Sequence, residues 1–170
     1  IVGSGRSGST LLDRTLGHHS QGFSIGEIIN FHLDVGRNSL CGCGTELNQC
    51  KFWGKFIEQM NDKYAIDIRS NTEAFSLHIN EYRKGFAKIY YQIRNSILLF
   101  FKVPLSLYYK KPWMTRTKEI YDFVFANTNA SFLVDSSKSL TRVLYLSRLL
   151  KNQYKIKVIH LHRDGRGVLH

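Results

Sequence analysis

Short apolar runs and longer stretches with helical spacing alternate along the chain. Four of the runs have the length of strands, and they centre on Ile1, Phe23, Leu133 and Ile159. Apolar residues recur at helical spacing between them, over residues 9–17, most of 51–128, and 139–150. Because strands that alternate with helices usually form a parallel sheet flanked by helices, the pattern predicts an α/β fold.

The most apolar run, residues 97–109, contains Lys102 and Pro104 and is shorter than the roughly 20 residues that a helix needs to span a bilayer. We therefore expect a buried helix that ends near the proline, and no transmembrane segment. No repeat or Pro/Gly-rich linker divides the chain, so residues 1–170 are expected to form one domain. The chain begins within a predicted strand and without Met, so we expect this domain to be incomplete at its start.

The chain is strongly basic, since 24 Lys and Arg residues against 13 Asp and Glu residues give a formal net charge of +11 at pH 7. Such an excess favours an anionic partner, such as a nucleotide, a nucleic acid, an anionic lipid surface or a sulfated or phosphorylated substrate. No RNA- or DNA-binding motif is present, which argues against a nucleic acid. A module that binds nucleotides without catalysis remains an alternative.

Polar or glycine-rich segments follow each predicted strand. They are residues 3–10 (GSGRSGST), 26–27 (GE), 135–138 (DSSK) and 162–167 (HRDGRG). In a parallel sheet, ligands bind outside the carboxyl ends of the strands, where these segments converge. The pattern therefore predicts a ligand site at this edge of the sheet.

The first of these segments fits two phosphate-binding signatures. Its glycines form the G-x-G-x-x-G pattern of dinucleotide-binding proteins, and Glu27 lies at a suitable distance to bind a ribose hydroxyl. The same glycines fit a P-loop, but Ser9 stands where the phosphate-binding lysine belongs, which argues against hydrolysis of ATP or GTP. Backbone amides at a helix N-terminus, the Arg6 guanidinium and several hydroxyls instead indicate a cradle for a compact, highly charged anion.

Two segments resemble the donor-binding motifs of sulfotransferases that use 3′-phosphoadenosine 5′-phosphosulfate (PAPS). GSGRSGSTLLDRTLG is similar to their 5′-phosphosulfate loop, and VIHLHRDGRGV is similar to their 3′-phosphate motif. Among these enzymes the likeness is greatest to tyrosylprotein sulfotransferases and related bacterial sulfotransferases, in which a Gly-Glu pair follows the loop. The resemblance implies a P-loop-like parallel sheet flanked by helices, with PAPS as co-substrate and no required metal.

The resemblance also assigns roles to individual residues. Glu27, 21 residues after Arg6, matches the general base that takes a proton from the acceptor. Arg6 and Lys138 match the cations that stabilise the leaving phosphate, and Arg163 matches the arginine that binds the 3′-phosphate. Asp135 is interpreted as a strand-end or capping carboxylate. The residues expected to cradle the 5′-phosphosulfate are Gly5, Arg6, Ser7, Gly8, Ser9 and Thr10.

The acceptor is expected to be a hydroxyl or an amine. Tyrosylprotein sulfotransferases follow the base with basic residues that bind acidic peptides, whereas residues 28–30 (IIN) follow Glu27 here. A carbohydrate, a lipid or a small metabolite is therefore expected at least as much as a peptide. An NAD(P)-dependent Rossmann oxidoreductase remains the alternative enzyme. The compartment would be the cytoplasm in a bacterium or the Golgi lumen in a eukaryote.

The 3′-phosphate motif reaches the end of the chain. In the enzymes that it resembles, a serine further along shares the 3′-phosphate with the arginine, and this position would lie beyond His170. The domain is therefore expected to be incomplete at this end too. We expect the 170 residues alone to be inactive and to bind adenosine 3′,5′-bisphosphate weakly.

The chain contains three cysteines, Cys41, Cys43 and Cys50, which are too few for a disulfide scaffold. A structural zinc site usually has four ligands, and His32 is poorly spaced to be the fourth. A disulfide, a zinc clip and simple packing all stay open for these cysteines. Packing is the default interpretation, and no metal ligand is predicted.

Overall fold

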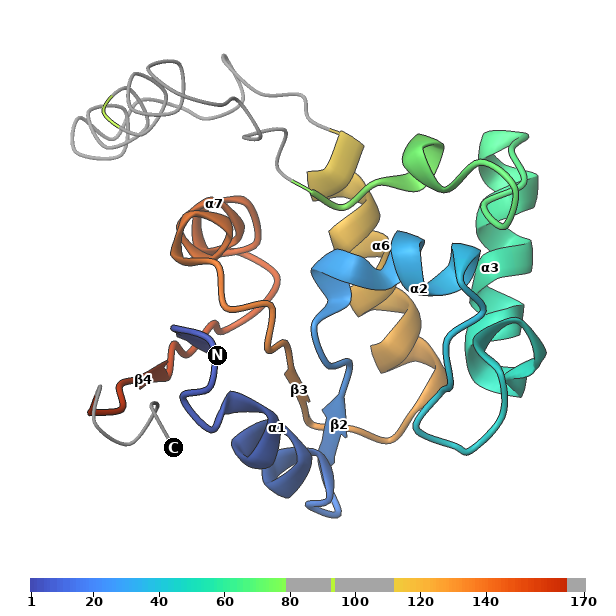
Figure 1. Ribbon diagram of the computed structural model, residues 1–170. Helices are drawn as coiled ribbons and strands as arrows, with labels where there is room; N and C mark the ends of the chain where they lie inside the picture. The colour runs from blue at the N-terminus through green and yellow to red at the C-terminus, as the bar shows by residue number, and fades with distance from the viewer. Residues whose placement is uncertain (79–92, 94–111, 165–170) are drawn as a thin grey trace.

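The structure is a computed structural model, and it describes residues 1–78, 93 and 112–164 (Figure 1). The helix expected at 97–109 and the last residues of the 3′-phosphate motif lie outside the described residues. The elements are β1 (Val2–Gly3), α1 (Ser9–Gly17), β2 (Gly22–Ser24), η1 (Ile28–Asn30), α2 (Phe31–Gly36), η2 (Leu47–Gln49), α3 (Lys51–Tyr64), η3 (Thr72–Phe75), α6 (Pro112–Asn127), β3 (Phe132–Val134), α7 (Leu140–Leu149) and β4 (His160–Leu161), where η denotes a 3-10 helix.

Within the described residues, the short strands form two small parallel sheets. β1 pairs with β4, and β2 pairs with β3. The two pairs meet at an isolated parallel bridge between Val2 and Lys138, where the Lys138 N–H donates to the carbonyl oxygen of Ile1 at 3.1 Å. The strands therefore lie in the order β2, β3, β1, β4. The predicted α/β fold with parallel strands flanked by helices is confirmed.

The fourth strand is shorter than the sequence pattern suggests. The apolar run around Ile159 favours a strand over residues 155–164, but β4 pairs with β1 only at His160 and Leu161. Strand backbone needs a paired neighbour to satisfy its N–H and C=O groups, and β1 is itself only 2 residues long. Residues 155–159 are exposed and line a cavity of about 750 Å³ that β3 and α7 also border.

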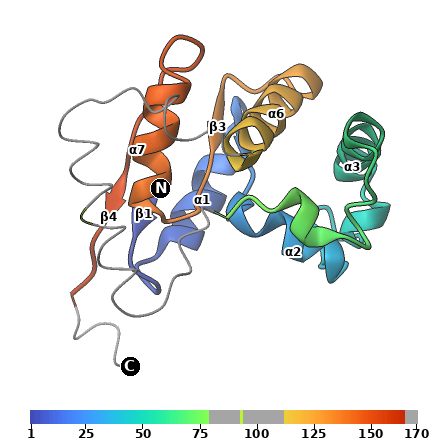
Figure 2. The ribbon, with the colours of Figure 1, turned by 90° about the horizontal axis from the view of Figure 1, so that it is seen from above.

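Helices flank the strands on two sides. In the view of Figure 1, α1 lies below the strands and α7 lies above them. Figure 2 shows from above that α2, α3 and α6 gather beyond the end of the sheet that β2 and β3 form. Among the described residues, no helix is both long enough and apolar enough to cross a membrane.

An aromatic cluster occupies the core between α2, α3, α6 and η3. Its most buried members, each at most 9% exposed, are Phe31, Trp53, Phe56, Phe75 and Phe123. Their ring centroids lie 5.1–6.5 Å apart in tilted or edge-on pairs, the arrangement that the ring quadrupoles favour. Phe23 of β2 joins the cluster through Phe52, whose ring centroid is 5.1 Å away. The core therefore anchors the strand that precedes Glu27.

His32 is a buried histidine near the start of α2, with 1% exposure. Its Nε2 lies 3.3 Å from the Ser76 hydroxyl, and its ring meets the His78 ring edge-on at 4.9 Å. Burial, reinforced by His78 and Arg116, lowers the pKa of His32 to about 4. An unfolded histidine titrates near pH 6.5, so the unfolded chain takes up a proton that the folded protein does not. The folded state therefore loses stability as the pH falls from about 6.5 to about 4.

Replacing His32 with glutamine is expected to make this part of the pH profile less steep. Glutamine does not titrate, and it keeps a hydrogen-bonding group near Ser76. Urea unfolding at a series of pH values between about 7 and 4 measures the effect, with the exposed His18→Gln as the matched control. The pKa of His78 is lowered too, so a smaller slope is expected to remain. If the free energy of unfolding fell equally steeply with pH in the wild type and in His32→Gln, His32 would not be the group that causes the loss of stability.

Candidate active site

The glycine-rich loop between β1 and α1 leads into a helix N-terminus. Gly8 caps α1 with φ +92°, a left-handed conformation that glycine adopts without strain. Its carbonyl oxygen accepts the N–H groups of Leu11 and Leu12, both at 3.1 Å. The first N–H groups of a helix have no acceptor within it, and the helix dipole places partial positive charge there. This end of α1 therefore suits a phosphate or sulfate group.

The residues of the loop differ in exposure. Arg6 is exposed, and its φ of +61° places an arginine in a left-handed conformation that costs about 1–2 kcal/mol. The other exposed members of the expected cradle are Gly5, Gly8 and Thr10. Ser7 is half-buried, and Ser9 is buried with 2% exposure. Ser9 therefore lies at the base of the loop, whereas Arg6 lies at its surface.

Glu27 lies in the turn that follows β2. It precedes η1, but its side chain makes no capping hydrogen bond to that helix. The carboxylate is 41% exposed, and its Oε1 accepts a hydrogen bond from Nζ of Lys138 in an ion pair. The structure therefore joins the two residues that the sequence places 111 positions apart.

Residues 135–138 run beside this turn. The N–H of Ser136 donates to the carbonyl oxygen of the residue before Glu27 at 2.9 Å. The N–H of Ile29 donates to the Ser137 hydroxyl at 3.2 Å. The two bonded residues of the turn lie on either side of Glu27 along the chain, and Lys138 directly follows Ser137. The carboxylate and the ammonium group are therefore held together by the backbone of both segments.

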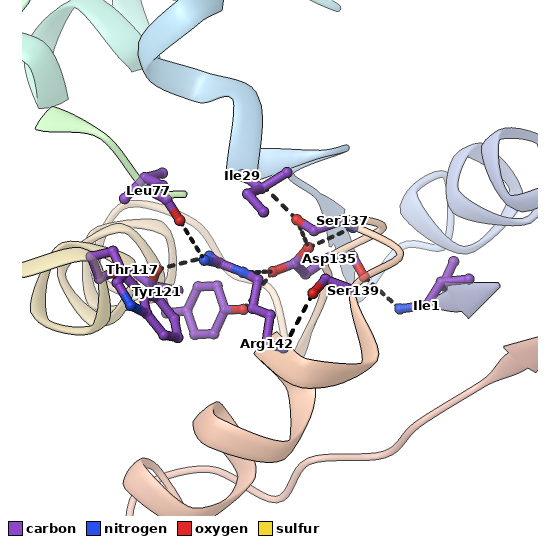
Figure 3. Close-up of polar contacts among 10 residues, drawn as sticks. Ile1, Ile29, Leu77, Thr117, Tyr121, Asp135, Ser137, Ser139 and Arg142 are labelled. Atoms are coloured by element: carbon purple, nitrogen blue, oxygen red, sulfur yellow. Dashed lines mark hydrogen bonds and ion pairs between the residues drawn. The ribbon is translucent and has the colours of Figure 1, made fainter. Parts of the chain in front are cut away.

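Asp135 anchors this segment (Figure 3). Its Oδ1 accepts the N–H and the hydroxyl of Ser137, at 2.9 and 2.5 Å, and its Oδ2 accepts the Tyr121 hydroxyl at 2.6 Å. Nε of Arg142 lies 3.8 Å from the same Oδ2. Burial, together with the charge of Asp135, raises the pKa of Tyr121 well above its usual value. Asp135 thus holds the end of β3 in place, in agreement with its interpretation as a strand-end carboxylate.

Arg142 connects this segment to the neighbouring helices (Figure 3). It is 1% exposed, and its Nη1 donates to the carbonyl oxygen of Leu77 at 3.1 Å. Its Nη2 donates to the Thr117 hydroxyl at 2.8 Å, and the guanidinium lies 5.2 Å from the centre of the Trp113 ring. A charged side chain at this depth is stabilised only by such partners. Arg142 therefore fixes α7 against α6 and the end of β3.

A second carboxylate, which is buried, supports the site from α1. Asp13 is 6% exposed and accepts the Ser24 hydroxyl at 2.7 Å. The same hydroxyl accepts the N–H of Gly26 at 3.2 Å, so α1 is joined to the turn that carries Glu27. Burial raises the pKa of Asp13, although hydrogen bonds from Ser24 and Ser136 oppose the shift.

The loops after β1 and β4 also meet. Nη1 of Arg163 donates to the carbonyl oxygen of Arg6 at 3.4 Å. Both arginines are exposed. Because β1 and β4 are parallel neighbours, the residues that follow them lie at the same edge of the sheet. The two segments that resemble donor-binding motifs are therefore in contact.

Three supporting residues were missed by sequence reasoning: Asp13, Tyr121 and Arg142. A signal was available for Arg142, which lies on the same face of its amphipathic helix as Tyr145 and Leu146. A charge on an apolar helix face requires buried partners, and this requirement could have identified it. Asp13 and Tyr121 had no comparable signal, because their partners Ser24 and Asp135 are specified only by the folded arrangement.

A comparison with models of protein families gives a match to the sulfotransferase family over residues 1–170. Comparisons with curated proteins and with solved structures each found no significant match. The family match covers the glycine-rich loop, the pair formed by Glu27 and Lys138, and the loop that carries Arg163. The chain therefore belongs to the sulfotransferase family.

Proposed function

We propose that the protein transfers a sulfuryl group from PAPS to a hydroxyl or an amine of an acceptor. The observation that carries the proposal is the ion pair between Glu27 and Lys138. It places a candidate base and a cation together, at the strand edge that also carries the glycine-rich loop. Membership of the sulfotransferase family supports the reaction class.

The loop residues suit the two anionic ends of PAPS. The first N–H groups of α1, together with Arg6, would bind the 5′-phosphosulfate. The Ser7 hydroxyl is buried and has no hydrogen-bond partner among the described residues, so a phosphate or sulfate oxygen would satisfy it. Arg163, which contacts the backbone of Arg6, would bind the 3′-phosphate.

Glu27 is the general base of the proposed reaction. It takes the proton from the acceptor O–H or N–H as the acceptor atom bonds to sulfur and the bond from sulfur to the bridging phosphate oxygen breaks. Lys138 and Arg6 stabilise the negative charge that moves onto the leaving phosphate. Such a reaction depends mainly on positioning and charge stabilisation, by analogy with phosphoryl transfer. These side chains supply the positive charge, so the proposal requires no metal in the transfer step.

The residues that follow Glu27 bear on the class of acceptor. A carbohydrate, a lipid, a small metabolite and a peptide each present a suitable hydroxyl or amine. Ile28 is 3% exposed and belongs to the apolar core, and the backbone of Ile29 bonds to Ser137. The residues that follow Glu27 therefore serve the fold, and they provide no basic surface for an acidic peptide.

Calorimetric titration of the natural full-length protein with adenosine 3′,5′-bisphosphate, NAD and ATP tests the donor site. We expect the bisphosphate to bind and the other two nucleotides to bind much more weakly. Arg6→Ala and Arg163→Ala are each expected to weaken bisphosphate binding by about 10- to 150-fold, because hydrogen bonds to charged groups contribute about 1.5–3 kcal/mol.

Arg37→Ala serves as the matched control, since it removes an exposed arginine at the end of α2, away from the strand edge. Its affinity for the bisphosphate is expected to equal that of the wild type. Tighter binding of NAD than of the bisphosphate would contradict the proposal and favour a dinucleotide-binding enzyme. If Arg163→Ala bound the bisphosphate with wild-type affinity, Arg163 would not be the residue that binds the 3′-phosphate.

A further inference from the structure

The three cysteines lie together, between the end of α2 and the start of α3. Figure 1 shows that the segment between these helices lies away from the strand edge that carries the proposed donor site. Sγ of Cys50 lies 3.5 Å from Sγ of Cys41 and 3.6 Å from Sγ of Cys43, and all three sulfur atoms lie within 4.8 Å of one another. The three thiols are free. Residues separated by up to nine positions in sequence thus present their sulfur atoms to one point.

The two separations from Cys50 match those of a metal-thiolate site. A zinc ion bonded to sulfur at about 2.3 Å holds tetrahedrally arranged sulfur atoms about 3.8 Å apart. The distances from Cys50 to Cys41 and Cys43 are within about 0.3 Å of that value. Thiolate ligands select soft or borderline ions such as zinc over magnesium or calcium.

The backbone around Cys41 and Cys43 forms a tight turn that holds the two residues close together. Leu40 and Glu46 form an antiparallel bridge, and the N–H of Gly44 donates to the carbonyl oxygen of Cys41 at 2.9 Å, which closes a tight turn. Gly44 has φ +86°, which glycine adopts without strain. Within this turn, the backbone N–H of Cys43 donates to the sulfur of Cys41. Hydrogen bonds of this kind orient and stabilise metal-bound thiolates.

Cys50 comes from a different element and completes the cluster. It is 4% exposed, and it occupies the N-cap position of α3, where the helix dipole favours negative charge. Three thiolates and one divalent zinc ion carry a net charge of −1, which this position stabilises. Cys43 is exposed, so water can reach the sulfur atoms from its side of the cluster.

We infer that Cys41, Cys43 and Cys50 bind one zinc ion, with a water molecule as the fourth ligand. Binding replaces the three thiol protons, which pass to solvent, with three zinc–sulfur bonds, and no oxidation or reduction occurs. The ion joins the turn at residues 41–44 to the N-terminus of α3. This site is separate from the proposed sulfuryl transfer and does not depend on it.

The experiment measures metal content and coordination in the untagged full-length protein, purified in oxygen-free buffer. We expect one zinc ion per chain by elemental analysis. After exchange, cobalt(II) is expected to show the visible absorption of tetrahedral coordination and a charge-transfer band from thiolate. Cys43→Ser, at an exposed position, is expected to weaken zinc binding by more than the roughly 10- to 100-fold that loss of an outer-shell contact causes. Circular dichroism is expected to show that this variant remains folded.

Glu46→Gln is the matched control, because it changes a potential metal ligand next to the turn without touching the sulfur atoms. Its zinc affinity is expected to equal that of the wild type. Wild-type protein without zinc and without the cobalt charge-transfer band would overturn the inference. A disulfide between any two of the cysteines in the purified protein would overturn it as well, and so would wild-type zinc affinity in Cys43→Ser.

Discussion

Replacing Glu27 with glutamine is expected to lower kcat for sulfuryl transfer by about 10²- to 10⁴-fold, the usual contribution of a general base. Glutamine has nearly the same shape, and its amide oxygen can still accept a hydrogen bond from Lys138, but it cannot take a proton. Because Glu27 is proposed to contact the acceptor and not the nucleotide, the affinity for adenosine 3′,5′-bisphosphate is expected to change little. Initial-rate kinetics with PAPS and calorimetry with the bisphosphate measure the two effects separately.

Glu58→Gln is the matched control, since it removes an exposed carboxylate on α3. It is expected to leave both kcat and nucleotide affinity unchanged. If Glu27→Gln weakened nucleotide binding as much as it lowered turnover, Glu27 would contact the nucleotide, as the ribose-binding carboxylate of a dinucleotide-binding enzyme does. If turnover were retained, Glu27 would not be the base.

The positions of the strands could be predicted because each is a short apolar run followed by polar residues. Their lengths could not, because pairing depends on the neighbouring strand. The run around Ile159 has enough apolar residues for a longer strand, but it forms a strand with β1 only at His160 and Leu161, with one more bond from the Val2 N–H to the Ile159 carbonyl oxygen. A sequence pattern shows that a segment can form a strand, whereas the length of that strand depends on the length of the neighbouring strand with which it pairs.

The convergence of Arg6, Glu27, Lys138 and Arg163 could also be predicted, because the carboxyl ends of parallel strands share one edge. The contact between Glu27 and Lys138 could not. It depends on the two hydrogen bonds that tie residues 136 and 137 to the turn beside Glu27, and on a left-handed backbone at Lys138, with φ +60°. Neither feature has a signature in the sequence, where lysine is not a residue that favours positive φ.

For the cysteines, too, the folded structure determines what the sequence spacing leaves open. Their spacing left a disulfide, a zinc clip and packing open, because sequence separation alone does not fix the distances between sulfur atoms. The turn at residues 41–44 and the position of Cys50 at the start of α3 bring the sulfur atoms together. Cys50 also packs in the apolar core, with Cys41 against it, and the proposed zinc ion adds a metal to this packed arrangement.

Replacing Arg142 with methionine is expected to lower the free energy of unfolding by about 3–5 kcal/mol, the usual effect of removing one partner of a buried ion pair. Methionine fills a similar volume but removes the donors to the Leu77 carbonyl oxygen and the Thr117 hydroxyl. It also leaves Asp135 without its guanidinium neighbour, at a side-chain exposure of 17%. Urea unfolding monitored by tryptophan fluorescence and by circular dichroism measures the change.

Two comparisons separate the ion pair from loss of packing. Arg37→Met, at an exposed position, is expected to change the free energy of unfolding by less than about 0.5 kcal/mol. Asp135→Asn keeps polar contacts to Tyr121 and Ser137 but removes the negative charge, so the methionine substitution is expected to cost less in that background. Equal costs in both backgrounds would mean that Arg142 stabilises the fold through Leu77, Thr117 and Trp113 and not through Asp135. If Arg142→Met lowered the free energy of unfolding of the otherwise wild-type protein by less than about 1 kcal/mol, the contacts of Arg142 would not stabilise the fold as we expect.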